Sequence, residues 1–378
     1  MVKYEVRLYL NGSLIGDIRP LAQNLTWTRR RTKVGADSID FTINDMLWAD
    51  WCKARRITIK QLLKPLALEC RIVRDGVEVM GGFLATMPAY QPLEASANLA
   101  LKFDGFLNLL GGVYIRNTTN NLPKGTITGN AGTLVSDMIT FANTVSGNAG
   151  KSYGFSAGTV DTMESITHTF DNYKTVKDWI CDRCDNTTGA GSFDVYFHPD
   201  KKYDIKADSN FGDVITDWIG FYPTQLNGTS VSSISAGEVG DFASAVLGLG
   251  AGEVSANAKE NTALLKFTSA PSVVSDYGYY ETLYQDSSVS TGSVLQNNIN
   301  AELSNRQNPI WQPEIKLSGV QVAPTPTGSD KIWIGDTIKI NNSLDLTGMT
   351  NGDFRVNELS VAVSANNAET ITPVLERV

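Results

Sequence analysis

Apolar and polar residues alternate along the first ten positions of the chain, and this period of two predicts a β-strand. One face of the strand carries Tyr4, Val6, Leu8 and Leu10. Asn11 and Gly12 follow directly, and an Asn-Gly pair supplies the positive φ angles of a tight hairpin turn. Later positions with the same alternation are Leu25, Trp27, Ile39, Phe41 and Ile43.

A second hairpin is predicted in "LECRIVRDGVEVMGGFLATM", residues 68–87, with its turn at Asp75 and Gly76. A further strand follows near Leu99, Leu101 and Phe103. We therefore expect residues 1–115 to form a small antiparallel β-barrel, because closure hides the strand edges that would otherwise be exposed.

The stretch "NDMLWADWC" interrupts this series of strands and predicts a short helix within residues 44–63. The residues expected to turn inward are Met46, Leu47, Trp51 and, less clearly, Trp48. A helix inserted between strands is also a candidate contact for a partner protein.

The pattern changes near residue 116, and residues 116–211 predict a small α+β module. Leu134, Met138 and Ile139 have helical spacing, with Thr133 placed to cap that helix. Thr175 and Asp178 form a variant capping box before a second helix. "SFDVYFHPDKKYDIKA" then predicts a hairpin.

From residue 212 strands return, and residues 212–268 with 310–378 predict a second β-barrel. Between them, residues 269–309 form a linking module with a helix that is stopped by Asn308-Pro309. The apolar positions of that helix are Leu295, Ile299 and Leu303. "IGDTIKINNSLDLTGMTNGDF" repeats the strand–turn–strand pattern of residues 68–87, which weakly indicates an internal repeat.

Composition fits a mainly β, α+β protein of more than one domain. Hydrophobic residues make up 42% and charged residues 19% of the 378 positions, as in globular proteins. The net charge of -8 and a pI near 5.0 argue against a duplex-binding protein. The basic run of Arg29, Arg30, Arg31 and Lys33 is interpreted as a solvated strand end or a rim contact.

Targeting signals and cysteines add little. The first residues of the chain alternate between polar and apolar types, so they contain no apolar block of a signal peptide. No apolar run approaches the roughly 20 residues that span a bilayer. The four cysteines suggest free thiols made in a reducing compartment.

Motifs with residue types used in catalysis or metal binding are present, but the residues around them do not match the structural setting that these functions need. "GFSAG" places Ser156 in a G-x-S-x-G pattern, with His168 or His198 as the available base, yet both flanks have loop composition. "LGLGAGE" resembles a dinucleotide fingerprint but has Glu253 in place of its third glycine. The sequence therefore predicts neither catalytic residues nor a cofactor.

Other candidate chemistry is equally isolated. Cys181 and Cys184 form a single C-x-x-C without a second pair, so we predict no metal site. Glu164 and Glu281 are the acids that come nearest to a glycosidase pair, although neither has an apolar setting.

Aromatic residues gather in "DYGYYETLY", where Tyr277, Tyr279 and Tyr280 fit strand packing or a subunit interface equally well. The same cluster is the one candidate surface for a carbohydrate-binding receptor module. Trp48, Trp51 and these three tyrosines are the predicted interface residues.

The order of these pieces resembles the bacteriophage tail hub (baseplate hub) family, which is related to the hub part of the type VI secretion spike. The similarity extends over essentially the whole chain and lies in collinear order rather than in one motif. The matching stretches are the first strand with its Asn-Gly turn, "LALECRIVRDGVEVMGGFLATM", "FDGFLNLL", the helices near 133 and 175, "DFASAVLGLGAGE", "DYGYYE" and "IGDTIKI…FRVNELSVAV".

This resemblance implies a non-enzymatic structural protein at the virion tail tip. In such hubs two similar barrels in each of three subunits make a ring with pseudo-six-fold symmetry, which adapts a six-fold tube to a three-fold tip. Implied partners are two further copies of the chain, a tail tube or distal tail ring protein, the tape-measure protein, a tip, spike or fibre protein, and DNA in transit.

Two departures from the family pattern bear on function. The sequence ends at Val378, directly after the last predicted strand, so we expect no C-terminal lysozyme, peptidase or fibre extension. The insertion at 44–63 adds Trp48 and Trp51 as possible partner contacts. A tail-associated cell-wall hydrolase is the alternative function that the sequence leaves open.

Overall fold

The computed structural model of this chain describes residues 2–88, 98–170, 172–186, 192–221, 230–238, 242–252, 262–287, 289–307, 311–318, 332–342 and 352–378. The chain divides into two compact units. Unit 1 comprises residues 1–234, 314–376 and 378, and unit 2 comprises residues 235–313 with 377. Every helix in the described ranges is too short or too polar to cross a lipid bilayer.

The N-terminal part of unit 1 consists of strands with one helical insertion. Its elements are β1 (Tyr4–Leu10), β2 (Ser13–Asp17), β3 (Gln23–Arg30), β4 (Ser38–Asn44), α1 (Asp45–Ala54), α2 (Ile59–Leu62), β5 (Leu68–Arg74), β6 (Val77–Leu84) and β7 (Asn98–Gly105). Both predicted turns are confirmed, because Asn11 and Gly12 have φ of 50° and 81° and Asp75 and Gly76 have 49° and 83°. Positive φ at both turn positions matches the right-handed twist of the flanking strands.

The C-terminal part of unit 1 returns to the same sheet. The strands are β13 (Val214–Phe221), β14 (Ser230–Glu238), β18 (Trp311–Ser318), β19 (Thr337–Asn342), β20 (Gly352–Val363) and β21 (Glu369–Arg377), and the boundary between the units falls within β14 and β18. β19 pairs antiparallel with β20, as the predicted hairpin repeat requires.

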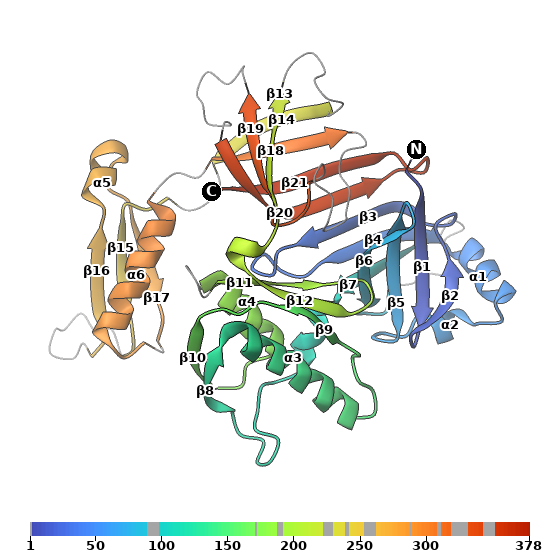
Figure 1. The fold of residues 1–378 in the computed structure, drawn as a ribbon, viewed down its shortest axis with the longest axis horizontal. Helices are drawn as coiled ribbons and strands as arrows, with labels where there is room; N and C mark the ends of the chain where they lie inside the picture. Colours follow the sequence, from blue (N-terminus) through green and yellow to red (C-terminus); the bar gives the residue numbers. More distant parts are fainter. Residues whose placement is uncertain are drawn as a thin grey trace. The chain divides into compact units, whose positions relative to one another are not determined.

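One long strand joins the two ends of the chain. β20 pairs with β19 through its first residues, where Phe354 lies opposite Ile338, and with β3 through its last residues, where Val361 lies opposite Trp27. In Figure 1 β20 runs beside β3, and the described strands form a sheet of 13 in the order β14-β18-β21-β20-β3-β4-β7-β6-β5-β1-β2, with β19 and β13 branching from β20. The first and last parts of unit 1 therefore share one hydrogen-bonded sheet.

The strand ladders do not by themselves make two closed barrels. Among the described strands, β2 pairs only with β1, and no ladder joins it to β3. Closure into two barrels and pseudo-six-fold symmetry stay predictions, whereas the mainly β character with added helices is confirmed.

A single core lies under this sheet and draws on both ends of the sequence. The buried residues include Leu25 and Trp27 from β3 together with Phe354 and Val361 from β20. The rings of Trp27 and Trp333 lie 6.4 Å apart between centroids. Aromatic side chains of this size bury about 150–250 Å² each, so this contact ties the two ends together by packing as well as by hydrogen bonds.

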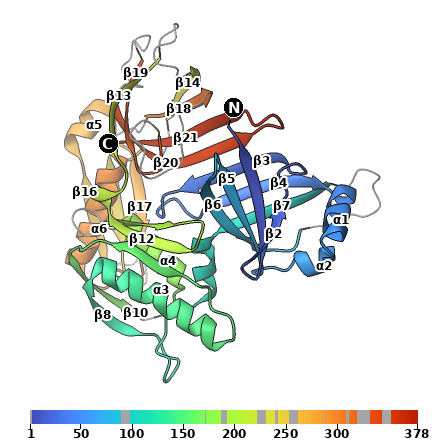
Figure 2. The same ribbon diagram turned by 45° about the vertical axis from the view of Figure 1, so that its right-hand side comes forward.

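Helices and strands alternate over residues 106–210, and their assignment to a separate module at 116–211 stays a prediction. The elements in this range are a 3-10 helix (Phe106–Gly112), β8 (Gly125–Asn130), α3 (Ala131–Asn148), β9 (Ser156–Val160), β10 (Ser165–Phe170), α4 (Val176–Asn186), β11 (Phe193–Phe197), β12 (Lys202–Ala207) and a 3-10 turn (Asp208–Asn210). β8 pairs with β10, and β12 lies between β11 and β9. Figure 2 shows α3 and α4 against these strands.

The two helix caps of this module differ in how well the sequence predicted them. Thr175 caps α4 as expected, because its Oγ1 accepts the Asp178 N–H at 3.0 Å. α3 begins earlier than predicted, and its cap is Asn130, whose Oδ1 accepts the Thr133 N–H at 3.2 Å. The prediction of Thr133 as the cap is wrong, because Thr133 lies in the first turn of the helix. Asn130 stands at the cap position, is a favoured cap residue and also donates to the Met163 carbonyl.

Unit 2 is a small sheet covered by one helix. Its elements are β15 (Ala245–Leu249), β16 (Leu265–Ser269), α5 (Pro271–Tyr277), β17 (Glu281–Gln285) and α6 (Gly292–Arg306). The inward positions of α6 are confirmed, since Leu295, Ile299 and Leu303 are buried. The helix ends at Arg306, and Asn308-Pro309 lies outside the described residues.

This sheet differs from the expected division of the chain. The sequence pattern predicts residues 212–268 in the second barrel and 269–309 in a separate module, yet β15 and β16 pair with β17 in a sheet of their own. An alternating strand looks the same in sequence whichever sheet it joins, so the pattern could not decide between the two.

Candidate functional site

Arg29 is a fully buried cation that links three parts of unit 1. Its side chain is 1% exposed and forms an ion pair with Asp37 at 2.5 Å. It also donates to the carbonyl of Val79 on β6 at 2.8 Å and to that of Phe197 on β11 at 2.9 Å. Its guanidinium carbon lies 4.6 Å from the centre of the Tyr196 ring, a cation–π distance.

Arg31 makes a second buried ion pair two residues further on. Its side chain is 4% exposed and contacts the Asp194 carboxylate at 2.5 Å, and it also pairs with Asp208. Burial alone would lower the pKa of Arg31, but the two carboxylates raise it, so the guanidinium stays charged. Asp194 also accepts the Thr32 N–H at 2.9 Å, which satisfies its second oxygen.

Arg355 completes what we call the arginine junction, which consists of Arg29, Arg31 and Arg355 with Asp37, Asp194 and Asp208. Arg355 lies on β20 and pairs with Asp208 at 2.8 Å. Its other nitrogen donates to the Phe211 carbonyl at 2.7 Å. The junction therefore binds β3, the middle module and β20 to one another.

The junction corrects our interpretation of the basic run. Arg29 and Arg31 were expected at a solvated strand end, but both lie in the interior of unit 1. The one signal that sequence offered is Asp194, a carboxylate within the otherwise apolar "FDVYF". Residues 163 positions apart cannot be paired from a single sequence, so the partner stayed hidden.

Asp336 is a second buried carboxylate, in the turn before β19. It accepts the N–H of Asp213 at 2.8 Å and that of Trp333 at 2.5 Å. Burial nevertheless raises its pKa to about 6, because the two N–H groups offset the loss of hydration only in part.

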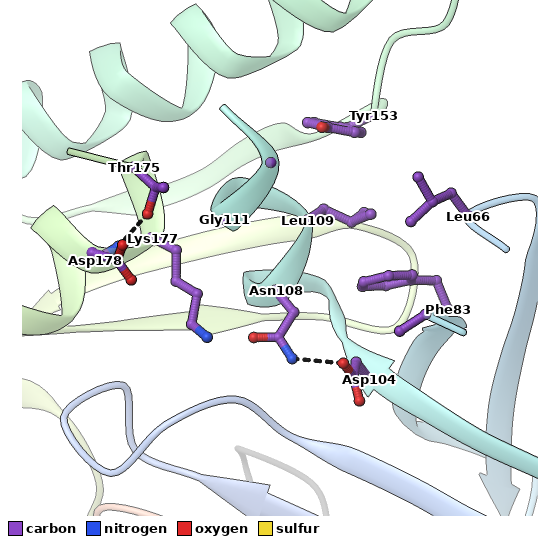
Figure 3. A pocket seen from close by; sticks show the side chains of 12 residues that line it. Leu66, Phe83, Asp104, Asn108, Leu109, Gly111, Tyr153, Thr175, Lys177 and Asp178 are labelled. Atoms are coloured by element: carbon purple, nitrogen blue, oxygen red, sulfur yellow. Dashed lines mark hydrogen bonds between the residues drawn. The ribbon is translucent and has the colours of Figure 1, made fainter. Parts of the chain in front are cut away.

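A cavity of about 480 Å³ opens between β6, the 3-10 helix and the start of α4. Figure 3 shows Phe83 and Leu109 on its apolar side, with Lys177 directed toward Asn108. Asn108 donates to Asp104 at 3.0 Å. The lining residues include no cysteine, histidine or serine, so the cavity has no nucleophile of those types.

The helical insertion protects a strand edge. Trp51 donates from Nε1 to the Asp17 carbonyl at 3.3 Å, and Arg55 donates to the Ile15 carbonyl at 3.2 Å. Both acceptors lie on β2, and in Figures 1 and 2 α1 and α2 lie alongside that strand. Side chains thus cover an edge that would otherwise offer backbone groups to another strand.

The orientation of this helix differs from the prediction. Trp48 is fully buried and stacks on Trp51 with 5.4 Å between ring centroids. Met46 is 70% exposed, and Leu47 also faces outward. Trp48 is therefore a core residue rather than a surface contact, whereas Trp51 stays a predicted interface residue. The inward prediction was wrong for Met46 and Leu47, because the buried face of this helix is the one that carries Trp48 and Cys52.

The tyrosine cluster lies in unit 2 where α5 leads into β17. Tyr279 and Tyr280 are exposed, so neither is packed within the sheet. The Tyr280 backbone N–H donates to the Ser244 hydroxyl at 2.7 Å, which fixes this corner to the start of β15. The side chain of Tyr277 lies outside the described residues. All three stay predictions as interface residues.

The motifs with catalytic residue types lack the geometry that catalysis needs. Ser156 begins β9 and is exposed, whereas a nucleophile elbow requires a strand before the serine and a helix after it. His198 hydrogen bonds Asp204 at 2.8 Å, and His168 contacts Arg183. Glu164 and Glu281 are both exposed, so neither has the apolar surroundings of a glycosidase acid.

The cysteine pair is also poorly placed for redox or metal chemistry. Cys184 is buried, and burial raises the pKa of its thiol well above the ordinary value. A thiolate is the form that attacks disulfides and binds metals, so this environment disfavours both. No cluster of three or more metal-ligating side chains occurs among the described residues.

The fold is similar to those of solved phage tail proteins. A tail protein from Neisseria meningitidis matches with a TM-score of 0.56 and 12% identity over 99% of this chain and 96% of the other. A 43 kDa tail protein of prophage MuSo2 from Shewanella oneidensis gives 0.58 and 11% over 99% and 98%. A prophage tail protein from Listeria monocytogenes gives 0.51 and 11% over 98% and 94%. No family model matches the sequence, and no curated protein matches it significantly.

Proposed function

Because this chain has the fold of phage tail proteins along its whole length, we propose that it is a structural hub at the tip of a phage tail. The observation that carries the proposal is the extent of the likeness, which includes both units and both ends of the sequence. A local motif could be shared by chance or by unrelated proteins, whereas this likeness extends over 99% of the chain.

The sheet of unit 1 contains both the first and the last strands of the chain, which supports a role in transmitting mechanical force. The first strands and the last strands share ladders, a core and the arginine junction, so a force on one end is transmitted to the other. In the proposed hub, the regions β1–β7 and β13, β14, β18–β21 are the two barrel-like halves. Three copies then place six halves in a ring, which meets a six-fold tube above and a three-fold tip below.

The proposed neighbours follow from that position. A tail tube or distal tail ring protein lies above the hub, a tip, spike or fibre protein lies below, and the tape-measure protein and DNA pass through the lumen. The net charge of -8 per chain disfavours adhesion of phosphates to a lumen, so DNA passes without binding.

The oligomeric state of the purified chain tests this function. We expect light scattering to give the mass of three copies, about 123 kDa from the 41.0 kDa chain, and negative-stain images to show a three-fold ring with a central opening. A chain that stays monomeric at every concentration contradicts the ring. A turbidity assay on purified cell walls tests the alternative function. Lysis of the walls would support a hydrolase in place of a hub.

A further inference from the structure

Among the described residues of unit 2, α6 packs on one face of the sheet and the other face is left open. Side chains alternate along a strand, and α6 covers the side on which Val246 is buried and on which a Cβ at Gly248 would lie 2.5 Å from Ile299. The other side carries the odd-numbered residues of β15 and their cross-strand neighbours. Leu247 lies opposite Phe267 and Leu283, and Leu249 lies opposite Leu265.

This open face carries apolar side chains that are exposed to solvent in the single chain. Phe267 is 49%, Leu283 58% and Leu265 44% exposed. β15 and β17 are parallel, and parallel strands are ordinarily buried on both faces. The core on the α6 side contains five buried residues in the described part of unit 2.

The size of the face is that of an interface centre rather than of a whole interface. Three strands about 4.8 Å apart and five residues at about 3.3 Å each cover roughly 240 Å² of flat area. A stable interface takes about 800 Å² from each partner, so this face needs a surrounding rim. The exposed Tyr279 and Tyr280 lie at the β17 end of the sheet and belong to the residue types enriched at interfaces.

The composition of the face identifies the kind of partner. Of its nine positions, three from each strand, Glu281 is the one that carries a charge, and it lies in the end row with Ala245 and Ser269. The other two rows contain four leucines, one phenylalanine and one glutamine. Interfaces between identical subunits have apolar centres depleted in charge, whereas transient contacts between different proteins are more polar.

We propose that a second copy of this chain covers the open face, with Phe267 and Leu283 at the centre of the contact. The inference rests on the proposed hub function, in which every subunit of a closed ring needs an apolar surface for its neighbour. It assigns part of the subunit contact to unit 2 and adds Phe267, Leu283, Leu247 and Leu265 to the two exposed tyrosines that precede β17.

Charge placed on this face tests the proposal in the full-length chain. Phe267→Asp and Leu283→Asp should each weaken self-association by roughly tenfold or more, because an interface centre cannot hydrate a carboxylate. Leu283→Ala should give a smaller loss. Val294→Asp is the matched control, since Val294 lies on α6 in the same unit and is 46% exposed.

Sedimentation velocity over a range of concentrations measures the association, and circular dichroism confirms that each variant keeps the wild-type content of strand and helix. A wild-type oligomer that the two aspartate variants dissociate and Val294→Asp preserves supports the proposal. An oligomer that all variants retain overturns this inference and leaves the hub function standing. A wild-type chain that stays monomeric overturns both.

Discussion

Arg31 shows how strongly a single buried charge can depend on its partners. The buried guanidinium is held by Asp194, which is also buried, and by the partly exposed Asp208. Replacing Arg31 by Met leaves the Asp194 carboxylate buried without its cation. Removal of one member of a buried pair costs about 3–5 kcal/mol, so R31M should lower the free energy of unfolding by an amount in that range.

Urea denaturation measures this loss, and two further variants separate charge from packing. The double variant R31M/D194L should recover part of the loss, because an apolar pair carries no desolvation cost. R56M is the control, since Arg56 is exposed, and it should change stability by less than about 0.5 kcal/mol. A loss for R31M no greater than that of R56M would show that the junction contributes nothing measurable.

Asp336 makes the free energy of unfolding depend on pH in a defined direction. Its pKa in the folded protein is raised to about 6 from 3.8, so the folded state binds this proton more tightly than the unfolded state. Its contribution to stability is therefore present below about pH 4 and is lost as the pH rises through about 6. Two pKa units correspond to about 3 kcal/mol, which is an upper limit here.

The Asp336→Asn variant removes the titration and keeps an oxygen acceptor for the turn. Wild type should lose about 2–3 kcal/mol relative to D336N between roughly pH 4 and pH 7, as measured by urea midpoints at each pH. Taking the difference between the two proteins cancels the titration of all other groups. Equal slopes for the two proteins would contradict a raised pKa at Asp336.

At the level of elements, close approach of backbones explains the Gly-Gly pair of β6. A Cβ at Gly82 would lie 2.7 Å from the Asp104 carbonyl oxygen on β7, and one at Gly81 would lie 2.8 Å from the Phe106 ring and from Pro199. Glycine is needed here for space rather than for a positive φ. β6 pairs with β7 at Gly82, Phe83 and Leu84, so a displaced backbone loses this short ladder.

Gly82→Ala should therefore lower the free energy of unfolding by about 1–3 kcal/mol, the usual cost of forcing atoms into a packed interior. Gly147→Ala is the matched control, because Gly147 lies in α3 with its nearest neighbour, Ser152, at 3.7 Å from an added Cβ. That change should be neutral or should raise stability by up to about 1 kcal/mol. Thermal denaturation of both variants decides the matter, and equal effects would refute the close-approach argument.

At the level of the whole molecule, the first and last strands of unit 1 belong to one sheet, which residues 1–115 do not form alone. Residues 1–115 were expected to be a barrel that closes on itself. In the structure β3 pairs with β20, and the core under it includes Trp333, Phe354 and Val361 from the far end of the sequence. A fragment of residues 1–115 thus lacks the partner of one edge and part of its core.

We expect that fragment to be insoluble or unfolded when it is produced alone, because it exposes the β3 edge and the apolar surface of Trp27. Solubility and circular dichroism of the fragment check this, with the full-length chain as the control. A soluble fragment with cooperative thermal unfolding would show that the first seven strands are independent of β20.

Local order was set by the sequence alone. Alternation placed the strands near both ends of the chain, Asn-Gly and Asp-Gly placed the two turns, and Leu295, Ile299 and Leu303 placed the buried side of α6, because each depends on residues a few positions apart. Strands β8, β9 and β10 were not predicted. The fold is similar to those of solved tail proteins, and the hub role stays a proposal.

Tertiary structure decided the rest. It pairs Arg31 with Asp194, turns Trp48 inward and Met46 outward, joins β20 to β3, and puts β15 beside β17 with one apolar face uncovered. Each of these depends on contacts between residues far apart in the chain. Their free energy comes from burial and desolvation at the place where they meet, and a pattern of neighbouring residues does not contain it.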